Sequence, residues 1–496
     1  MPRSARFLCW FLLTALAVSA AERPVSRPGV LHLTHESAMQ MALAKSFAIQ
    51  VESFGPKIKS QLVRSELGAF DPLLKAEWGR TENTKRNLFL DSTVQLQKAS
   101  NTRGDDWNVG FGGLTPWGLR YDLGLGTTEA SGTSVLGHET FETGVRAKLE
   151  QPLLRGFGPA ANLDQVRIAR NNAVASEWTF RQKIIDILTD TDSGYNELHF
   201  SIENLRVKER SRALAQQLYA DNEARLKIGV KSPLDVTEAR AEAAAREEEV
   251  IVARRKVRDN ENLLKQLVTD DLESMLAIQV EIEPPPSPAF VAAVPEGIDD
   301  ALGLRPDYRK AVLELQNRHI NLAFRRNATL PRFDLTGSLE LLGLDNDFAT
   351  SLDRVPHRDR TVWTVGAIVS IPIPNRDARG QESAARLQVA QQLVALKELE
   401  QQIVVDVDNA SGQVVTSRER IVSTAEARRL AQESLDAGEE RLKAGVGTTF
   451  VVLELQSKLA LAEAAEIRAR ADYNIAVGKY YQQTGTSLRV YNVKVE

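Results

Sequence analysis

The sequence Arg-Leu-Lys-Ile-Gly-Val at residues 225–230 returns as Arg-Leu-Lys-Ala-Gly-Val at residues 441–446, an offset of 216 residues (441 − 225). Glycine adopts without strain the left-handed backbone conformation that ends many helices. In the first copy Pro233 follows, and proline suits the first turn of a new helix. A repeat on this scale indicates two copies of one supersecondary unit. We therefore predict two helical hairpins that reverse at these two motifs.

Long stretches without helix breakers lead up to each motif. Residues 162–228 contain no proline and one glycine, Gly194, and no proline follows Pro374. Sixty helical residues at 1.5 Å each extend about 90 Å, several times the width of a small domain. The segments that return after each motif space their apolar residues three and four apart, as helices in coiled coils do. The sequence therefore predicts long helical hairpins at 162–271 and 376–484.

The two copies differ in length ahead of these helices. Pro152 matches Pro372 at an offset of 220, whereas Pro72 matches Pro331 at an offset of 259. The first copy therefore carries 39 extra residues (259 − 220) between Pro72 and Pro152. This insertion is rich in aromatic and turn-forming residues, which predicts an added hairpin outside the membrane with its turn near 116–118. The sequence leaves the role of the hairpin open.

Four segments alternate between apolar and polar side chains. In residues 141–150 every second side chain is polar or glycine, and residues 332–341, 363–371 and 74–78 show similar apolar faces. Runs of about 9–11 residues suit tilted strands that cross a bilayer, but a soluble sandwich with one wet face produces the same alternation. Four strands are fewer than the roughly eight that close a barrel, so several chains have to contribute strands.

The start of the chain has the features of a signal peptide. Arg3 and Arg6 precede an apolar run at 7–18, and small residues follow up to Ala21. The single cysteine, Cys9, lies in this segment, so we expect no disulfide and no cysteine-bound metal in the mature chain. The expected organisation is a signal peptide at 1–21, a first repeat at 22–283 with strands at about 73–151, a Pro-rich linker at 284–297, a second repeat at 298–488 with a helix at 306–329 and strands at 332–373, and a C-terminal tail at 489–496.

Composition argues against several classes of function. The formal net charge is −4, so we expect no nucleic-acid partner, which would need a basic surplus. His32 and His35 lie near the start of the mature chain and the other four histidines are scattered, and acidic pairs such as Asp270 and Asp271 have no nucleophile or base beside them in the sequence. We therefore predict no metal site, no cofactor and no enzymatic activity.

The order of strands, giant helices and duplicated turns resembles the outer-membrane efflux protein (TolC) family. The most specific shared parts are the two glycine turns, Arg305-Pro306-Asp307 and the strand ends at Pro152 and Pro372. The resemblance implies an α+β membrane protein: a trimeric β-barrel, with about four strands per chain plus the added hairpin, continued by a long α-helical barrel. Twelve strands would then come from three chains.

The family resemblance also implies a location and partners. We expect a homotrimer in the lipid of the bacterial outer membrane that extends into the periplasm as a passive export duct. Its partners would be a periplasmic adaptor (membrane fusion) protein and an inner-membrane RND or ABC pump, in a tripartite efflux or type I secretion system. The cargo stays open among drugs, metal ions and polypeptides. The alternative is a periplasmic coiled-coil adaptor without a pore, which alternating strands containing Trp78 and Trp363 disfavour.

Candidate site residues follow from the resemblance and lie at the helical reversals. The adaptor-docking residues would be Arg225, Gly229, Val230, Arg441, Gly445 and Val446; alternatively, the glycines only end helices. The family narrows its pore with acids one and two turns past the second reversal, positions that hold Val451 and Glu454 here, so half of the acidic ring is lost. Their first-copy counterparts, Asp235 and Glu238, are expected to latch helices through Arg441 or Lys443, unless they simply belong to a solvated helix face.

Overall fold

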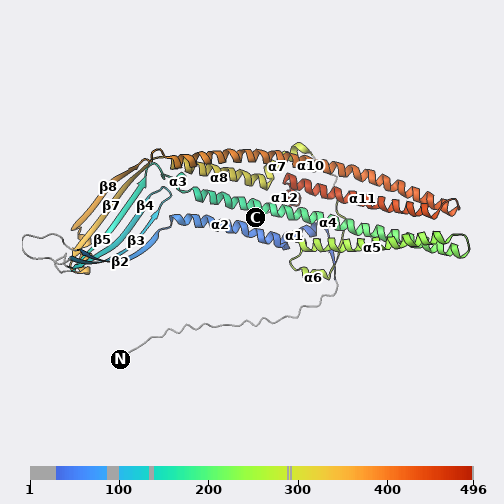
Figure 1. Ribbon diagram of the computed structural model, residues 1–496, viewed down its shortest axis with the longest axis horizontal. Coiled ribbons are helices and arrows are strands. Elements are labelled where there is room, and N and C mark those ends of the chain that lie inside the picture. Colours follow the sequence, from blue (N-terminus) through green and yellow to red (C-terminus); the bar gives the residue numbers. More distant parts are fainter. Residues whose placement is uncertain (1–28, 86–99, 133–138, 288–289, 291–292, 494–496) are drawn as a thin grey trace, which may run out of the picture.

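The computed structural model is an elongated molecule with a β-sheet at one end and helical hairpins at the other (Figure 1). It describes all residues except 1–28, 86–99, 133–138, 288–289, 291–292 and 494–496, so the predicted signal peptide lies outside the described residues. No helix in the described part of the chain is long and apolar enough to cross a membrane.

Six strands form one antiparallel sheet in the order β2-β3-β4-β5-β7-β8. The strands are β2 (Leu73–Lys85), β3 (Ser100–Leu114), β4 (Arg120–Gly132), β5 (Thr140–Pro152), β7 (Arg332–Asp345) and β8 (Arg360–Ser370). The four predicted strands correspond to β2, β5, β7 and β8, and the predicted insertion supplies β3 and β4. The two edge strands of the sheet, β2 and β8, lie far apart in the sequence.

The added hairpin is part of the sheet, with its turn near residues 116–118 as predicted. The Trp117 carbonyl accepts a hydrogen bond from the Gly158 backbone N–H (3.1 Å), which places the turn at the helical end of the sheet. Its strands pair with β2 on one side and β5 on the other. Pairing within the sheet satisfies backbone groups that a separate hairpin would leave to solvent.

The two faces of the sheet differ in chemistry. Pairing across all six strands aligns one row of apolar side chains: Leu74, Phe111, Leu123, Ala147, Leu339 and Trp363. Five of these six side chains are large hydrophobics between 36% and 73% exposed in the single chain. We call this the apolar face. The next residue on each strand points to the opposite face, the polar face, which carries Lys75, Arg146 and Glu340.

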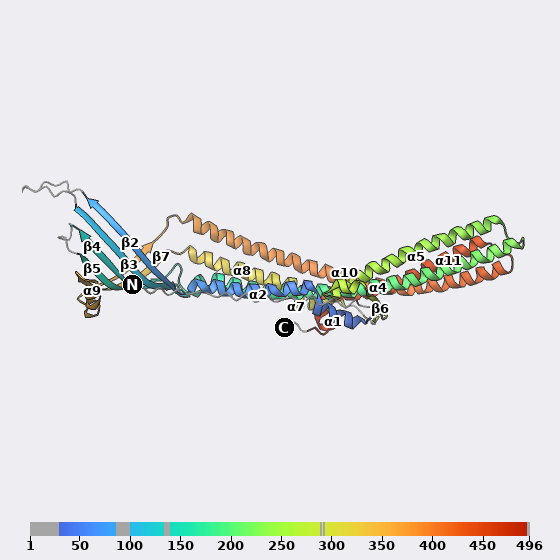
Figure 2. The ribbon, with the colours of Figure 1, turned by 90° about the horizontal axis from the view of Figure 1, so that it is seen from below.

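Four long helices run away from the sheet, and two of them turn back as hairpins (Figure 2). Helices α2 (Phe47–Leu67), α4 (Asp164–Lys227), α8 (Pro306–Ala328) and α10 (Arg376–Lys443) form the part near the sheet, and α5 (Pro233–Val268) and α11 (Thr449–Thr484) return along α4 and α10. Helix α11 also packs against α4, so the two hairpins lie side by side. Helices α4 and α10 occupy the two long stretches without proline, whereas α2 continues through Gly55 and Pro56.

Short elements surround the helices near the middle of the molecule. They are β1 (Val30–Leu33), which pairs in parallel with β6 (Gln279–Ile282), and the helices α1 (His35–Lys45), α6 (Leu272–Leu276), α7 (Val294–Leu304) and α12 (Ser487–Val490). Helix α3 (Pro159–Asn162) joins β5 to α4, and α9 (Phe348–Arg354) lies between β7 and β8. One core cluster centres on Tyr195 and Leu264, and a second centres on Val407 and Tyr480.

Candidate functional site

The two reversal motifs form the same backbone turn at the tips of the hairpins. Gly229 and Gly445 each have φ of 78°. The N–H of Val230 donates to the Arg225 carbonyl (2.9 Å), and the N–H of Val446 donates to the Arg441 carbonyl (3.0 Å). These bonds satisfy the last carbonyls of α4 and α10, as C-terminal helix motifs with left-handed glycine do. The duplication therefore preserves a defined geometry at both tips.

The first returning helix begins with a complete capping box. The Ser232 hydroxyl accepts a hydrogen bond from the Asp235 N–H (3.2 Å), and the Asp235 carboxylate accepts one from the Ser232 N–H (3.1 Å). Burial raises the pKa of Asp235, but the hydrogen bonds from Ser232 and the charge of Lys231 outweigh it and hold that pKa below its usual value. Asp235 thus serves its own helix end.

The second returning helix has half of this cap. Thr448 accepts a hydrogen bond from the Val451 N–H (3.4 Å), but the valine side chain offers no acceptor in return. One turn further, Glu454 forms an ion pair with Lys458 four residues later (2.7 Å). Both side chains are about half exposed, which keeps the strength of this pair modest. The carboxylate expected at the aperture thus has a cation beside it.

The two tips are joined by a lysine that the sequence analysis did not single out. Lys231, in the first turn, donates to the hydroxyl of Thr449 at the start of α11 (2.8 Å). The predicted latch between Asp235 and Arg441 or Lys443 is not among the contacts of the described chain, where Lys443 pairs with Glu440 (2.9 Å). The reason is local: Asp235 is already bonded within its own turn.

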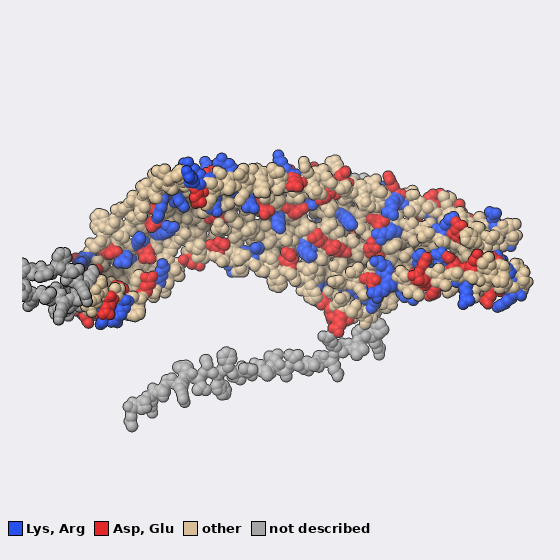
Figure 3. Space-filling view, viewed as in Figure 1, with Lys and Arg blue, Asp and Glu red and all other residues tan. Residues whose placement is uncertain are grey.

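A narrow cleft and an apolar rim complete the tips. The cleft, about 210 Å³, lies between the hairpins, with Arg225 on one wall and Lys443 on the other. Beyond it, exposed apolar side chains cover the ends: Ile228, Val230, Leu234, Val446 and Phe450, all between 62% and 74% exposed. Exposed apolar residues that cluster inside a polar surround are typical of protein-binding surfaces. On the face shown in Figure 3, lysines, arginines and acids intermingle along the helices behind this rim.

Two signals in the sequence were available for the missed residues. The Ser232-Pro-Leu-Asp235 segment matches the spacing of a capping box, and Lys458 stands four residues after Glu454, the spacing of helical ion pairs. Glu238 forms no ion pair or side-chain hydrogen bond within the described residues, although it is matched in sequence to Glu454. The structure thus brings together Lys231 with Asp235 and Glu454 with Lys458, each pair within one tip.

Comparison with known proteins places this architecture in a family. The sequence profile named "Outer membrane efflux protein" matches residues 118–269 and 297–486, which include both helical hairpins. That family consists of efflux channels and is not a family of enzymes. Among the described residues, no group of three or more histidines, cysteines or acids is arranged to hold a metal ion.

Similar proteins include the outer membrane efflux protein BepC of Brucella suis biovar 1, 22% identical over 373 residues that cover 74% of this chain and 75% of BepC. The probable efflux pump outer membrane protein TtgC of Pseudomonas putida is 21% identical over 446 residues, 84% of this chain and 89% of TtgC. Nothing in these matches supports a periplasmic adaptor.

Solved structures share the fold at low sequence identity. The Campylobacter jejuni CmeC outer membrane channel superposes with a TM-score of 0.69 at 15% identity, covering 91% of this chain and 86% of CmeC. The VceC outer membrane protein of Vibrio cholerae gives a TM-score of 0.66 at 16% identity, covering 91% and 96%. The chain therefore belongs to the outer membrane efflux protein family and is an export channel of the outer membrane that extends into the periplasm.

Proposed function

We propose that three copies of this chain join into one duct, with their sheets paired edge to edge in a closed barrel. The single chain leaves both β2 and β8 with one unpaired edge, and long unpaired edges invite pairing with another strand. β2 runs away from the helices and β8 runs back toward them, so a β8–β2 joint between neighbours is antiparallel, like every other pair in the sheet. The exposed apolar face then contacts lipid.

The tips of the hairpins dock onto a periplasmic adaptor protein, which connects the duct to an inner-membrane RND or ABC pump. The observation that carries this proposal is the repeated turn: two copies with equal glycine φ present exposed Val230 and Val446 in the same backbone setting. Because the duct only conducts, energy and cargo choice come from the pump. Both a tripartite efflux system and a type I secretion system fit these contacts.

Tip docking is tested by crosslinking and co-purification of a periplasmic adaptor protein with this chain in the cells that produce it. Val230→Asp and Val446→Asp place charges on the apolar rim without touching the turn hydrogen bonds, so we expect at least a tenfold loss of recovered adaptor from the double variant. Val230→Ile and Val446→Ile keep an apolar surface and serve as the matched control. Full adaptor recovery with both aspartates in place would rule out the tips as the docking surface.

The aperture lies at the start of α11, where three copies of Glu454 form a ring. A ring of carboxylates attracts cations and repels anions, but Lys458 beside each carboxylate reduces the field, and Val451 supplies no second acid. We therefore propose a weakly cation-selective constriction. Because Glu454 and Lys458 form an ion pair, the ion selectivity of the constriction depends on both of these oppositely charged residues.

Planar-bilayer recordings of the purified protein test this aperture. Glu454→Gln is expected to shift the reversal potential in a salt gradient toward anion preference, and Lys458→Gln is expected to shift it the other way. Glu463→Gln, farther from the turn on the same helix, is the control for a general loss of charge. If neither change at 454 nor at 458 moves the reversal potential, Glu454 does not line the constriction.

A further inference from the structure

The inserted hairpin is built into the wall of the sheet along its whole length. β3 pairs with β2 from Leu73–Gly112 to Lys85–Ser100, and β4 pairs with β5 from Arg120–Glu150 to Ala130–Thr140. The β3 and β4 strands also pair with each other throughout. The hairpin therefore separates β2 from β5 by two strand positions. An appendage attached at a sheet edge would not have this effect.

The hairpin continues the apolar face without a break. Val109 on β3 lies opposite Ala76 on β2, and Leu125 on β4 lies opposite Val145 on β5. In the next row Trp107 pairs with Trp78, with ring centroids 6.4 Å apart. Val109, Leu125 and Trp107 are 42–55% exposed in the single chain. A segment placed in water would not need this matched band, whereas a strand that crosses a bilayer does.

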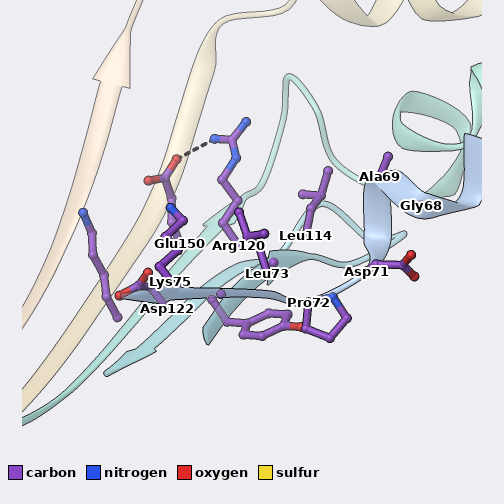
Figure 4. Close-up of a pocket in the computed structure, with 14 residues that line it drawn as sticks. Gly68, Ala69, Asp71, Pro72, Leu73, Lys75, Leu114, Arg120, Asp122 and Glu150 are labelled. Carbon is purple, nitrogen blue, oxygen red and sulfur yellow. Dashed lines mark hydrogen bonds and ion pairs between the residues drawn. The ribbon is translucent and has the colours of Figure 1, made fainter. Parts of the chain in front are cut away.

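The opposite side of the hairpin is polar. Near the helices, Lys75, Arg120, Asp122, Lys148 and Glu150 line a concavity of about 640 Å³, in which Arg120 pairs with Glu150 at 2.9 Å (Figure 4). Farther along, a Cβ at Gly110 would lie 2.7 Å from the Leu123 carbonyl oxygen. Glycine at this position allows the two backbones to approach, as occurs where sheets bend. The polar face is thus suited to line an aqueous interior.

We infer that this chain builds an outer pore of eighteen strands, six from each of three copies (6 × 3), in place of the twelve that four strands per chain would give. This inference rests on the proposed trimer. Barrel diameter grows roughly in proportion to strand number, so the outer pore is about 1.5 times wider than a twelve-stranded one. Barrels of 16–18 strands leave an aqueous channel.

The widening is confined to one end of the duct. Each chain contributes four helices, α4, α5, α10 and α11, to the part near the tips, and the strands of the inserted hairpin lie at the opposite end of the molecule (Figure 1). Three copies thus present twelve helices there (4 × 3), whatever the strand count. The hairpin sets the width of the outer pore and leaves the aperture unchanged.

Two neighbouring residues on β3 test the placement of the hairpin. Asn108 lies on the polar face and Val109 on the apolar face, and the only cysteine of the chain is Cys9. In a Cys9→Ser background reconstituted in vesicles, we expect Asn108→Cys to react with a charged, membrane-impermeant thiol reagent. Val109→Cys should react at least tenfold more slowly with it, yet readily with a lipid-soluble maleimide. Equal reactivity of both positions with the charged reagent would overturn the inference.

Deletion of residues 100–132 tests the width. This deletion removes β3 and β4 and lets β2 pair with β5, so the trimer keeps twelve strands. In planar bilayers, the largest neutral polyethylene glycol that enters from the outer side should fall by about 1.5-fold in radius relative to the full chain. Entry from the tip side should not change. An unchanged cutoff on the outer side would overturn the inference.

The outcomes separate the inference from the proposed function. If the full chain forms no channel in bilayers, the proposed duct is wrong, while the cysteine labelling still decides whether the hairpin crosses the membrane. If the full chain conducts but Asn108→Cys and Val109→Cys label alike, the duct stands and the eighteen-stranded pore is wrong. The labelling also remains informative if the deletion variant does not fold.

Discussion

The two returning helices, α5 and α11, carry different side chains at matched positions of the structural repeat. With the repeat offset of 216, Glu261 and Lys265 in α5 correspond to Val477 and Tyr481 in α11. The first pair is a buried ion pair (2.7 Å), with the lysine side chain 1% exposed. The second pair packs in an apolar core. The same helical position can therefore be filled by charge or by apolar volume, provided that partners are present.

The two tips have the same backbone turn but different caps at the start of the returning helices. Both glycines keep φ of 78°, but Asp235 completes a capping box that Val451 cannot. This comparison indicates that the turn geometry is the common requirement, while the polar groups around it vary between the repeats. The following predictions test that distinction, beginning with the largest expected effect.

The buried ion pair of α5, which α11 lacks at the matched positions, carries the largest expected effect. Lys265→Met leaves the Glu261 carboxylate buried without its main cation, and we expect a loss of about 3–5 kcal/mol in the free energy of unfolding. The measurement is the denaturant midpoint of helical circular dichroism in detergent. The double variant Glu261→Met with Lys265→Met should lose only about 1–3 kcal/mol, because the Val280 N–H then lacks its acceptor. A double variant less stable than the single one would show that the pair stabilises the repeat beyond its desolvation cost.

The shared turn predicts equal effects at both tips. A side chain at either glycine meets no atom within 4 Å, so only the left-handed backbone is strained. Gly229→Ala and Gly445→Ala should each weaken their tip by about 1–2 kcal/mol. Hydrogen exchange of amides in the last turn of α4 or α10 should then be roughly 5- to 30-fold faster. Asparagine, which tolerates this conformation, is the control; unequal effects at the two glycines would contradict a common turn.

The unequal caps predict opposite responses to substitution. Asp235→Ala removes the reciprocal hydrogen bond from α5 and should cost about 1 kcal/mol locally. Val451→Asp would complete the missing half of the cap on α11 and should stabilise it by a smaller amount. Hydrogen exchange in the first turns of α5 and α11 measures both. If Val451→Asp gave no added protection, the difference between the caps would have no energetic consequence.

Acidification should affect only the first tip. Because the pKa of Asp235 is lowered in the folded chain, its carboxylate stabilises the cap fully above the ordinary value of about 3.9, and this contribution is lost as pH falls through the folded-state pKa. Nitroxide labels at the matched positions Ile228→Cys and Ala444→Cys, in a Cys9→Ser background, report tip mobility by electron paramagnetic resonance. Mobility should rise at 228 and stay level at 444 below about pH 4. A parallel rise at both positions would point to general acid unfolding.

Periodicity and repetition predicted most of the fold because both are written in local residue types. The breaker-free stretches became α4 and α10, and the alternating segments became strands. The position of the inserted hairpin in the strand order was not predicted, because strand order depends on which strand edges pair. The alternating pattern around Val109 or Leu125 does not specify which strand lies beside it. At the candidate site, the sequence located both turns through glycine, but Lys231 reaches Thr449 across 218 residues of chain. No local spacing encodes such a contact.

The insertion of a hairpin also limits how such channels can evolve in size. β5 must run toward the helices because it leads into α4. The chain can therefore gain strands only in pairs, since a single added strand would leave the chain at the end of the membrane opposite the helices. In a three-fold assembly each such event adds six strands at once. The diameter of the outer pore can therefore change only in discrete steps. Duplication or loss of one hairpin within the gene makes such a step and leaves the end of the duct that faces the pump unchanged.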